Sequence, residues 1–161
     1  MPFIMMPVEI ITSLLAIQDT EFQKKIYVAI KQHTKENLIP QFSLTVGLEK
    51  QKELEILKDY FIASGWGNIQ TIDLELEAKR AMILVENSPF ATALKGKQQN
   101  PVDTFLRGIL AGIFSKMLGE DIDCVETECA AQNSERCNFI IKPKTEFDFT
   151  NPIVQQQLSA E

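Results

Sequence analysis

The chain has 161 residues, of which 45% are hydrophobic and 24% are charged, and its formal net charge is -6. This composition is typical of one folded domain with an apolar core, so we expect residues 1–161 to form a single domain. The acidic balance, without a dense cluster of Lys and Arg, gives no electrostatic basis for gripping a phosphate backbone, and we expect no direct nucleic-acid partner.

The N-terminal stretch MPFIMMPVEIITSLLAIQ is apolar but lacks a basic leader and a small-residue cleavage site, and Pro7, Glu9 and Gln18 interrupt it. It therefore does not have the pattern of a signal peptide, and a cytoplasmic location is expected. In that reducing compartment the three cysteines are expected to remain free of disulfides.

The first 64 residues predict helices, because their apolar residues recur every three to four positions. The expected helices cover Val8–Ile17, Glu21–Leu38 and Leu44–Ala63, the last of which ends at Ser64-Gly65. The single histidine, His33, falls among charged neighbours in the second helix, so we interpret it as a solvated surface residue.

After Gly65 the pattern changes to the alternation of strands. Residues 66–77 and 79–88 predict two strands, and residues 90–100 predict a loop. Pro101 is expected to begin a helix that ends near Gly119, because proline is favoured in the first turn.

Residues 121–131 and 136–142 then predict a hairpin that Pro143 ends. The order of these elements predicts an α+β fold, with an antiparallel sheet of about four strands and helices packed on one side. We expect N-terminal helices over about 8–64, a mixed core over about 65–143 and a peripheral tail over 144–161.

The stretch GILAG, Gly108–Gly112, lies inside the predicted fourth helix. Each glycine inside a helix costs roughly 1 kcal/mol relative to alanine, so two of them require a reason. Either a neighbouring element approaches the bare backbone closely, or a ligand rests on it. A membrane span is excluded by Arg107, Lys116 and the short length of the apolar run.

The stretch ETECAAQNSERC, Glu126–Cys137, places two of the three cysteines and two glutamates within twelve residues. A metal clip, a disulfide hairpin and a strand-turn-strand with core cysteines could each explain it, and the reducing compartment disfavours the disulfide. Thiolate sulfur and carboxylate oxygen are both zinc ligands. Glu126 and Cys129 would point to opposite faces of a regular strand, so a shared metal requires a bulge or a strand end between them.

Three stretches together resemble the 4-vinyl reductase domain family: NSP at residues 87–89, PVDTFLRGILAG at 101–112 and VETECAAQNSERCNF at 125–139. The resemblance covers most of the chain from Gly65 to Ile141. It implies an α+β fold related to the TRAPP vesicle-tethering subunits, with a hydrophobic pocket and a homodimer.

The resemblance also implies a structural zinc site. In the aromatic-responsive sensors of this family, zinc is held by a cysteine near the start of the glycine helix, by the glutamate and cysteine of Glu-Thr-x-Cys, and by the cysteine after the turn. Carried over, the ligands are Asp103, Glu126, Cys129 and Cys137, with aspartate in place of the family's first cysteine. Cys124 is an alternative ligand.

Three functions follow as hypotheses. The first is a domain without catalytic activity that senses or carries a small hydrophobic molecule. Its pocket would be lined by one face of the glycine helix, with help from residues 81–85 and 44–61; the helix residues are Phe105, Ile109, Gly112, Ile113 and Phe114.

The second hypothesis is an enzyme or accessory factor in vinyl reduction of a tetrapyrrole, and the third is a protein-interaction subunit. An unaided reductase is disfavoured because the chain has neither a dinucleotide fingerprint nor a cysteine-rich cluster site. Neither His33 nor Trp66 matches the polar residues with which the sensors read a phenolic hydroxyl, so the ligand class is not carried over.

Overall fold

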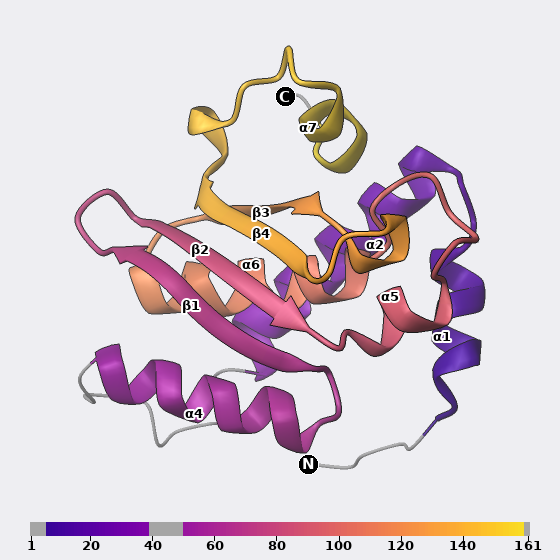
Figure 1. The fold of residues 1–161 in the computed structure, drawn as a ribbon. Helices are drawn as coiled ribbons and strands as arrows, with labels where there is room; N and C mark the ends of the chain where they lie inside the picture. The colour runs from indigo at the N-terminus through magenta and orange to yellow at the C-terminus, as the bar shows by residue number, and fades with distance from the viewer. Residues whose placement is uncertain (1–5, 39–49, 160–161) are drawn as a thin grey trace.

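A computed structural model describes residues 6–38 and 50–159 and has an α+β fold (Figure 1). Its elements in chain order are α1 (Val8–Leu15), α2 (Thr20–His33), η1 (Thr34–Leu38), α4 (Lys50–Ala63), β1 (Asn68–Glu75), β2 (Arg80–Glu86), α5 (Pro89–Ala93), α6 (Thr104–Leu118), β3 (Ile122–Glu128), η3 (Ala130–Gln132), β4 (Cys137–Pro143), η4 (Lys144–Glu146) and α7 (Pro152–Gln157). The predicted α+β class and four-stranded antiparallel sheet are confirmed.

The four strands form one sheet in the order β1-β2-β4-β3, and every neighbouring pair is antiparallel. Alternate residues of β2 face the core: Ile83 lies opposite Phe139 of β4, and Val85 lies opposite Cys137. All four of these side chains are fully buried. The pairing therefore places Cys137 at the end of the sheet's buried face.

Two helices cover this buried face. Helix α6 packs against β3 and β4, and α4 packs against β1 (Figure 1). Phe61 of α4 and Leu106, Leu110 and Phe114 of α6 are fully buried in the same core as Phe139. Helix α2 forms a further layer by packing against α6.

The contact between α2 and α6 is built around the two glycines of α6. A Cβ atom at Gly108 would lie 2.8 Å from the Cβ of Ile30, and one at Gly112 would lie 2.7 Å from the backbone oxygen of Lys31 and 2.6 Å from the Cβ of Thr34. Real side chains do not approach this closely. The glycines thus serve close helix–helix packing, which is the first of the two explanations for the GILAG stretch.

No strand of the described residues lies beside the outer edge of β3, yet side chains pair the backbone groups of three alternate residues along it. These side chains come from α2, α6 and α7, and they prevent the edge from remaining an open row of donors and acceptors. The bonds are Ser115 Oγ to Ile122 O (3.2 Å), Ile122 N to Ser115 Oγ (2.9 Å), Cys124 N to Tyr27 Oη (3.0 Å), Arg107 Nε to Cys124 O (3.1 Å), Glu126 N to Gln157 Oε1 (2.8 Å) and Gln157 Nε2 to Glu126 O (2.7 Å).

The tail differs from its prediction. Helix α7 packs against β3, and Val154, Gln157 and Leu158 are buried, so the tail is not peripheral. Its Asn151 caps the helix by accepting a hydrogen bond from the backbone N–H of Ile153 at 2.9 Å.

The predicted loop over residues 90–100 is wrong at its start, because α5 occupies Pro89–Ala93 with Ser88 as its cap. Helix α6 begins at Thr104, three residues after the proline expected to begin it. The third predicted helix is described only from Lys50, and its first six residues, 44–49, lie outside the described ranges. Within residues 6–38 and 50–159, no helix has the length and apolar character needed to cross a bilayer.

Candidate metal centre

Four buried residues meet where β3 ends, β4 begins and α6 begins. Glu126 belongs to β3, Cys129 follows the end of that strand, Cys137 is the first residue of β4, and Asp103 precedes the first turn of α6. Each of the four is 0% exposed. These are the four ligands that the resemblance implied.

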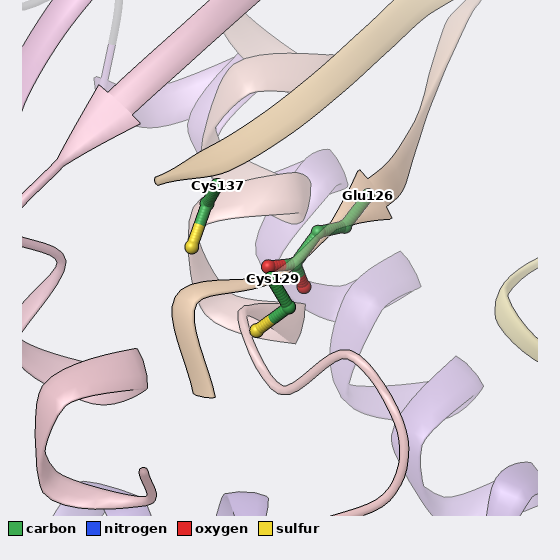
Figure 2. Close-up of side chains that lie close together, drawn as sticks. All are labelled: Glu126, Cys129 and Cys137. Atoms are coloured by element: carbon green, nitrogen blue, oxygen red, sulfur yellow. The ribbon is translucent and has the colours of Figure 1, made fainter. Parts of the chain in front are cut away.

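The end of β3 removes the geometric objection to a shared site. The pairing of β3 with β4 shifts register between Glu126 and Glu128, and Cys129 lies beyond the last strand residue. The side chains of Glu126 and Cys129 therefore need not alternate across the sheet. One donor atom each from Glu126, Cys129 and Cys137 lies within 4.8 Å of the other two, and Figure 2 shows the three side chains around one small space.

Asp103 adjoins this group of three and is oriented by its neighbours. Its backbone N–H donates to Glu126 Oε2 at 3.0 Å, and the Ser88 hydroxyl donates to its Oδ1 at 3.0 Å. Its other oxygen, Oδ2, and Glu126 Oε1 are buried and have no hydrogen-bond partner in the described part of the chain. Unpaired buried carboxylate oxygens are costly, and beside two thiols they form a donor set that a cation would satisfy.

Burial controls the ionisation of the two carboxyl groups. Burial, with the neighbouring Asp103 and Cys129, raises the pKa of Glu126 well above its usual range. Burial, with the neighbouring Cys129, raises the pKa of Asp103 to about 7. Both carboxyl groups are therefore unstable as bare anions in this space.

The two sulfur atoms differ in their neighbours. Hydrogen bonding from Cys137, supplemented by Glu126 and the backbone of Val102 and Ala131, lowers the pKa of Cys129 to about 6. The same hydrogen bond to Cys129, together with burial, raises the pKa of Cys137. Cys137 Sγ also accepts a hydrogen bond from the backbone N–H of Ala130 at 3.3 Å. Backbone donors of this kind stabilise thiolate, which is the form that binds metal.

The other residues singled out from the sequence lie elsewhere. Cys124 is buried in β3, its pKa is raised by burial, and it is not in the group of close ligand atoms. His33 is exposed, and its Nδ1 lies 3.4 Å from Asn37 Nδ2. Trp66 stacks edge-on against Tyr60 and Phe61.

The predicted pocket residues of α6 lie in different surroundings. Ile109, Ile113 and Phe114 are buried in the main core, and Phe105 is half-buried with its ring centroid 5.7 Å from that of Phe90. Gly112 lies in the contact with α2, so its backbone offers no bare surface to a ligand. Residues 44–49, expected to help line the pocket, lie outside the described ranges.

Two residues of the site were missed from the sequence. Ser88 was noted only as part of the NSP stretch. The proline that follows it is a signal for the start of a helix, and the Ser88 hydroxyl caps helix α5 there. Gln157 lies in a run of three glutamines, a pattern that gives no sign of a buried role.

Comparison with known proteins matches residues 82–143 to the 4-vinyl reductase domain, which confirms the resemblance over that stretch. An uncharacterized protein of Methanocaldococcus jannaschii is 28% identical over 103 residues, which are 60% of this chain and 59% of that protein. The chain thus spans about three fifths of the length of this curated relative.

Two solved structures with TM-scores above 0.5 share the fold. The phenol-responsive sensory domain of the transcription activator PoxR, solved with phenol, matches with a TM-score of 0.76 at 15% identity, over 98% of this chain and 85% of that chain. A vinyl-4-reductase family protein from M. jannaschii matches with a TM-score of 0.53 at 18% identity, over 88% and 98%. A trafficking protein particle complex subunit 3 from Naegleria fowleri has a TM-score of 0.46 at 14% identity, over 86% and 82%.

Proposed function

We propose, for a chain whose residues 82–143 match the 4-vinyl reductase domain, that it binds a small hydrophobic molecule as a sensor or carrier and holds one structural zinc ion. The fold match to a sensory domain solved with phenol supports the first part. The buried donor set of thiols and carboxylates supports the second.

The zinc proposal rests on one observation, which is that two thiols and two unpaired carboxylate oxygens are buried together. Zinc prefers four ligands of these kinds in a tetrahedron. Asp103, Glu126, Cys129 and Cys137 would supply all four, so no position would remain open for substrate, and the ion would be structural. It would tie the start of α6 to the end of β3 and the start of β4, and its charge would stabilise the ionised carboxylates.

Metal analysis tests this proposal. We expect close to one zinc per chain in the purified protein, and Cys129→Ser should lower both the metal content and the melting temperature. Cys124→Ser is the matched control, because it removes a buried thiol outside the group and should leave the metal content unchanged. Metal-free protein, or equal metal loss in both variants, would contradict the proposed zinc site and would indicate that Cys129 and Cys137 only fill the core.

The proposed ligand pocket uses the apolar face of α6. This face carries four large apolar side chains, those of Phe105, Ile109, Ile113 and Phe114. Phe61 of α4 adds a fifth. Gly112 has no part in it, since its face is occupied by α2. Pockets of this chemistry take aromatic, isoprenoid or tetrapyrrole molecules by burying apolar surface.

Native mass spectrometry separates the candidate functions, because one spectrum reports bound small molecule, bound zinc and the proposed homodimer. Titration with an environment-sensitive apolar dye, followed by displacement with aromatic, isoprenoid and tetrapyrrole compounds, should show saturable binding. Recovery of each compound chemically unchanged is expected for a sensor or carrier. Absence of any saturable binding would favour a protein-interaction subunit, and a reduced vinyl group would favour an enzyme.

A further inference from the structure

A hollow whose lining includes none of the four metal-centre residues lies between the end of α1, the first turn of α6 and α7. We call it the amide pocket, because six of the residues that line it are Gln or Asn: Gln18, Gln23, Gln98, Asn100, Gln156 and Gln157. Its volume is about 40 Å³. Among the described residues around it, Arg107 is the only one that carries a charge.

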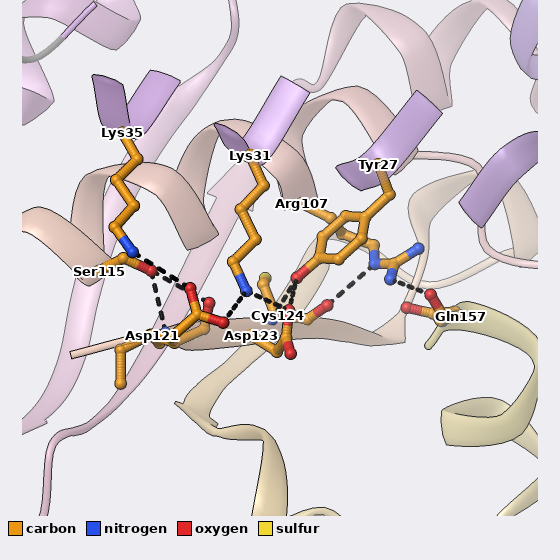
Figure 3. A network of polar contacts seen from close by, with 10 residues as sticks. Tyr27, Lys31, Lys35, Arg107, Ser115, Asp121, Asp123, Cys124 and Gln157 are labelled. Atoms are coloured by element: carbon orange, nitrogen blue, oxygen red, sulfur yellow. Dashed lines mark hydrogen bonds and ion pairs between the residues drawn. The ribbon is translucent and has the colours of Figure 1, made fainter. Parts of the chain in front are cut away.

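Arg107 is a buried cation whose direct partners are neutral. It is 3% exposed. Its Nε donates to Cys124 O at 3.1 Å, one Nη donates to Gln157 O at 2.7 Å, and its guanidinium carbon lies 4.5 Å from the centre of the Tyr27 ring. In Figure 3 no hydrogen bond or ion pair joins the remaining Nη to another of the residues drawn, and Arg107 forms no ion pair with a carboxylate of the described residues.

Two acidic residues, Asp123 and Glu126, act on Arg107 electrostatically without forming an ion pair with it. Asp123 accepts hydrogen bonds from the Tyr27 hydroxyl at 2.6 Å and from Lys31 Nζ at 2.8 Å. Glu126 turns its carboxylate toward the thiols of the metal centre. They act on Arg107 only at longer range, and burial lowers the pKa of Arg107 despite them. A buried cation in this position lacks a close counter-charge.

The start of α6 adds to the positive potential of the wall. Thr104 belongs to the first turn of α6, and no side chain of Asp103 caps that turn. A helix start adds positive partial charge.

We propose that the amide pocket binds a small carboxylate anion through the remaining Nη of Arg107. That nitrogen can donate a charge-assisted hydrogen bond to a carboxylate oxygen, and the neutral amide residues around it do not oppose the charge of the anion. The volume of about 40 Å³ admits a few water-sized groups, which suits an acid group of formate or acetate size. This site shares no residue with the proposed zinc ligands or with the proposed apolar pocket, and it does not rest on the proposed function.

Backbone and arginine side-chain NMR signals test the proposal, with acetate as the probe and sodium chloride at equal ionic strength as the reference. Acetate should produce saturable shifts at Thr104, at the Arg107 Nε–H and at Gln157, and formate should do the same. Chloride should not reproduce them. Shifts that never saturate, or identical saturable shifts with chloride, would overturn the proposal.

A pair of variants at the mouth of the pocket avoids disturbing the buried arginine. Asn100→Asp places a negative charge in the wall, and Gln99→Glu places the same charge one residue away, outside the wall. Because like charges repel at short range, Asn100→Asp should weaken acetate binding about threefold or more, while Gln99→Glu should change it much less. Equal effects of the two variants would contradict the proposal, and circular dichroism would establish that both variants are folded.

Discussion

Helix α2 approaches the backbone of α6 most closely at Gly112, and the substitution Gly112→Ala measures what that approach is worth. The added Cβ would lie 2.7 Å from the backbone oxygen of Lys31 and 2.6 Å from the Cβ of Thr34. Ordinary contact between carbon atoms begins near about 3.5 Å, so α2 would have to move away by several tenths of an ångström. The oxygen belongs to the backbone, and no side-chain rotation can relieve the contact.

Two effects of opposite sign set the magnitude. Alanine gains roughly 1 kcal/mol of helix propensity over glycine. Overpacking a filled interior costs about 1 to 3 kcal/mol, and here it also displaces the helix that carries Tyr27 and Lys31. The difference is about 0 to 2 kcal/mol, and because the clash is with backbone atoms we expect a net loss in its upper half, about 1 to 2 kcal/mol, for Gly112→Ala and a larger loss for Gly112→Leu.

Urea unfolding followed by circular dichroism gives the free energy directly. For a domain of this size, 1 kcal/mol corresponds to a melting-temperature change of about 2 to 4 °C. Gly108→Ala is the matched comparison, because its added Cβ would lie 3.1 Å from the nearest backbone oxygen, that of Tyr27, whereas at Gly112 the nearest backbone oxygen is 2.7 Å away. It should cost less than Gly112→Ala. A Gly112→Ala protein as stable as its parent would refute the close-packing explanation.

Three further outcomes are expected. Tyr27→Phe leaves the backbone N–H of Cys124 buried without its acceptor, and should lower the free energy of unfolding by about 1 to 3 kcal/mol in a denaturant titration; no change would mean that water replaces the hydroxyl. Gln157→Leu removes both bonds to the backbone of Glu126, so the amide of Glu126 should exchange with deuterium faster, and unchanged exchange would contradict the covered edge. In chelator-treated protein, the pKa of Asp103 is raised from 3.8 to about 7, so the folded state holds a proton that the unfolded state has lost, and stability should fall as pH rises between these values. Melting curves of Asp103→Asn should show a shallower fall, and equal slopes would count against the raised pKa.

The sheet could be predicted from the sequence because its strands differ in local pattern from the helices. The apolar run of residues 81–85 and the hairpin around residues 132–135 both lie in the strands and the turn where they were expected. The metal group could be predicted as residue types, but its closeness depends on the register shift after Glu126, which no local pattern of residues specifies.

Helices α5 and α7 and the burial of Arg107 could not be predicted from the sequence, for physical reasons. Helix α5 has five residues, too short for a periodic apolar face, and only the Ser88-Pro89 pair marks its start. Helix α7 contributes mainly through Gln157, whose value lies in two long-range bonds to the backbone. Arg107 was noted only as a charge that excludes a membrane span, because its burial follows from helices packed around it.

The covered edge of β3 has a consequence for the order of folding. Ser115 pairs with Ile122, seven residues away, so that part of the edge can close as soon as α6 and β3 meet. The bond from Cys124 to Tyr27 spans 97 residues, and closing so long a loop is slow. Until α2 docks, the backbone N–H of Cys124 in the middle of β3 lacks its acceptor and is open to pairing with another chain. Refolding at high protein concentration should therefore favour association through this strand, and a chain lacking α2 should aggregate even where its sheet is formed.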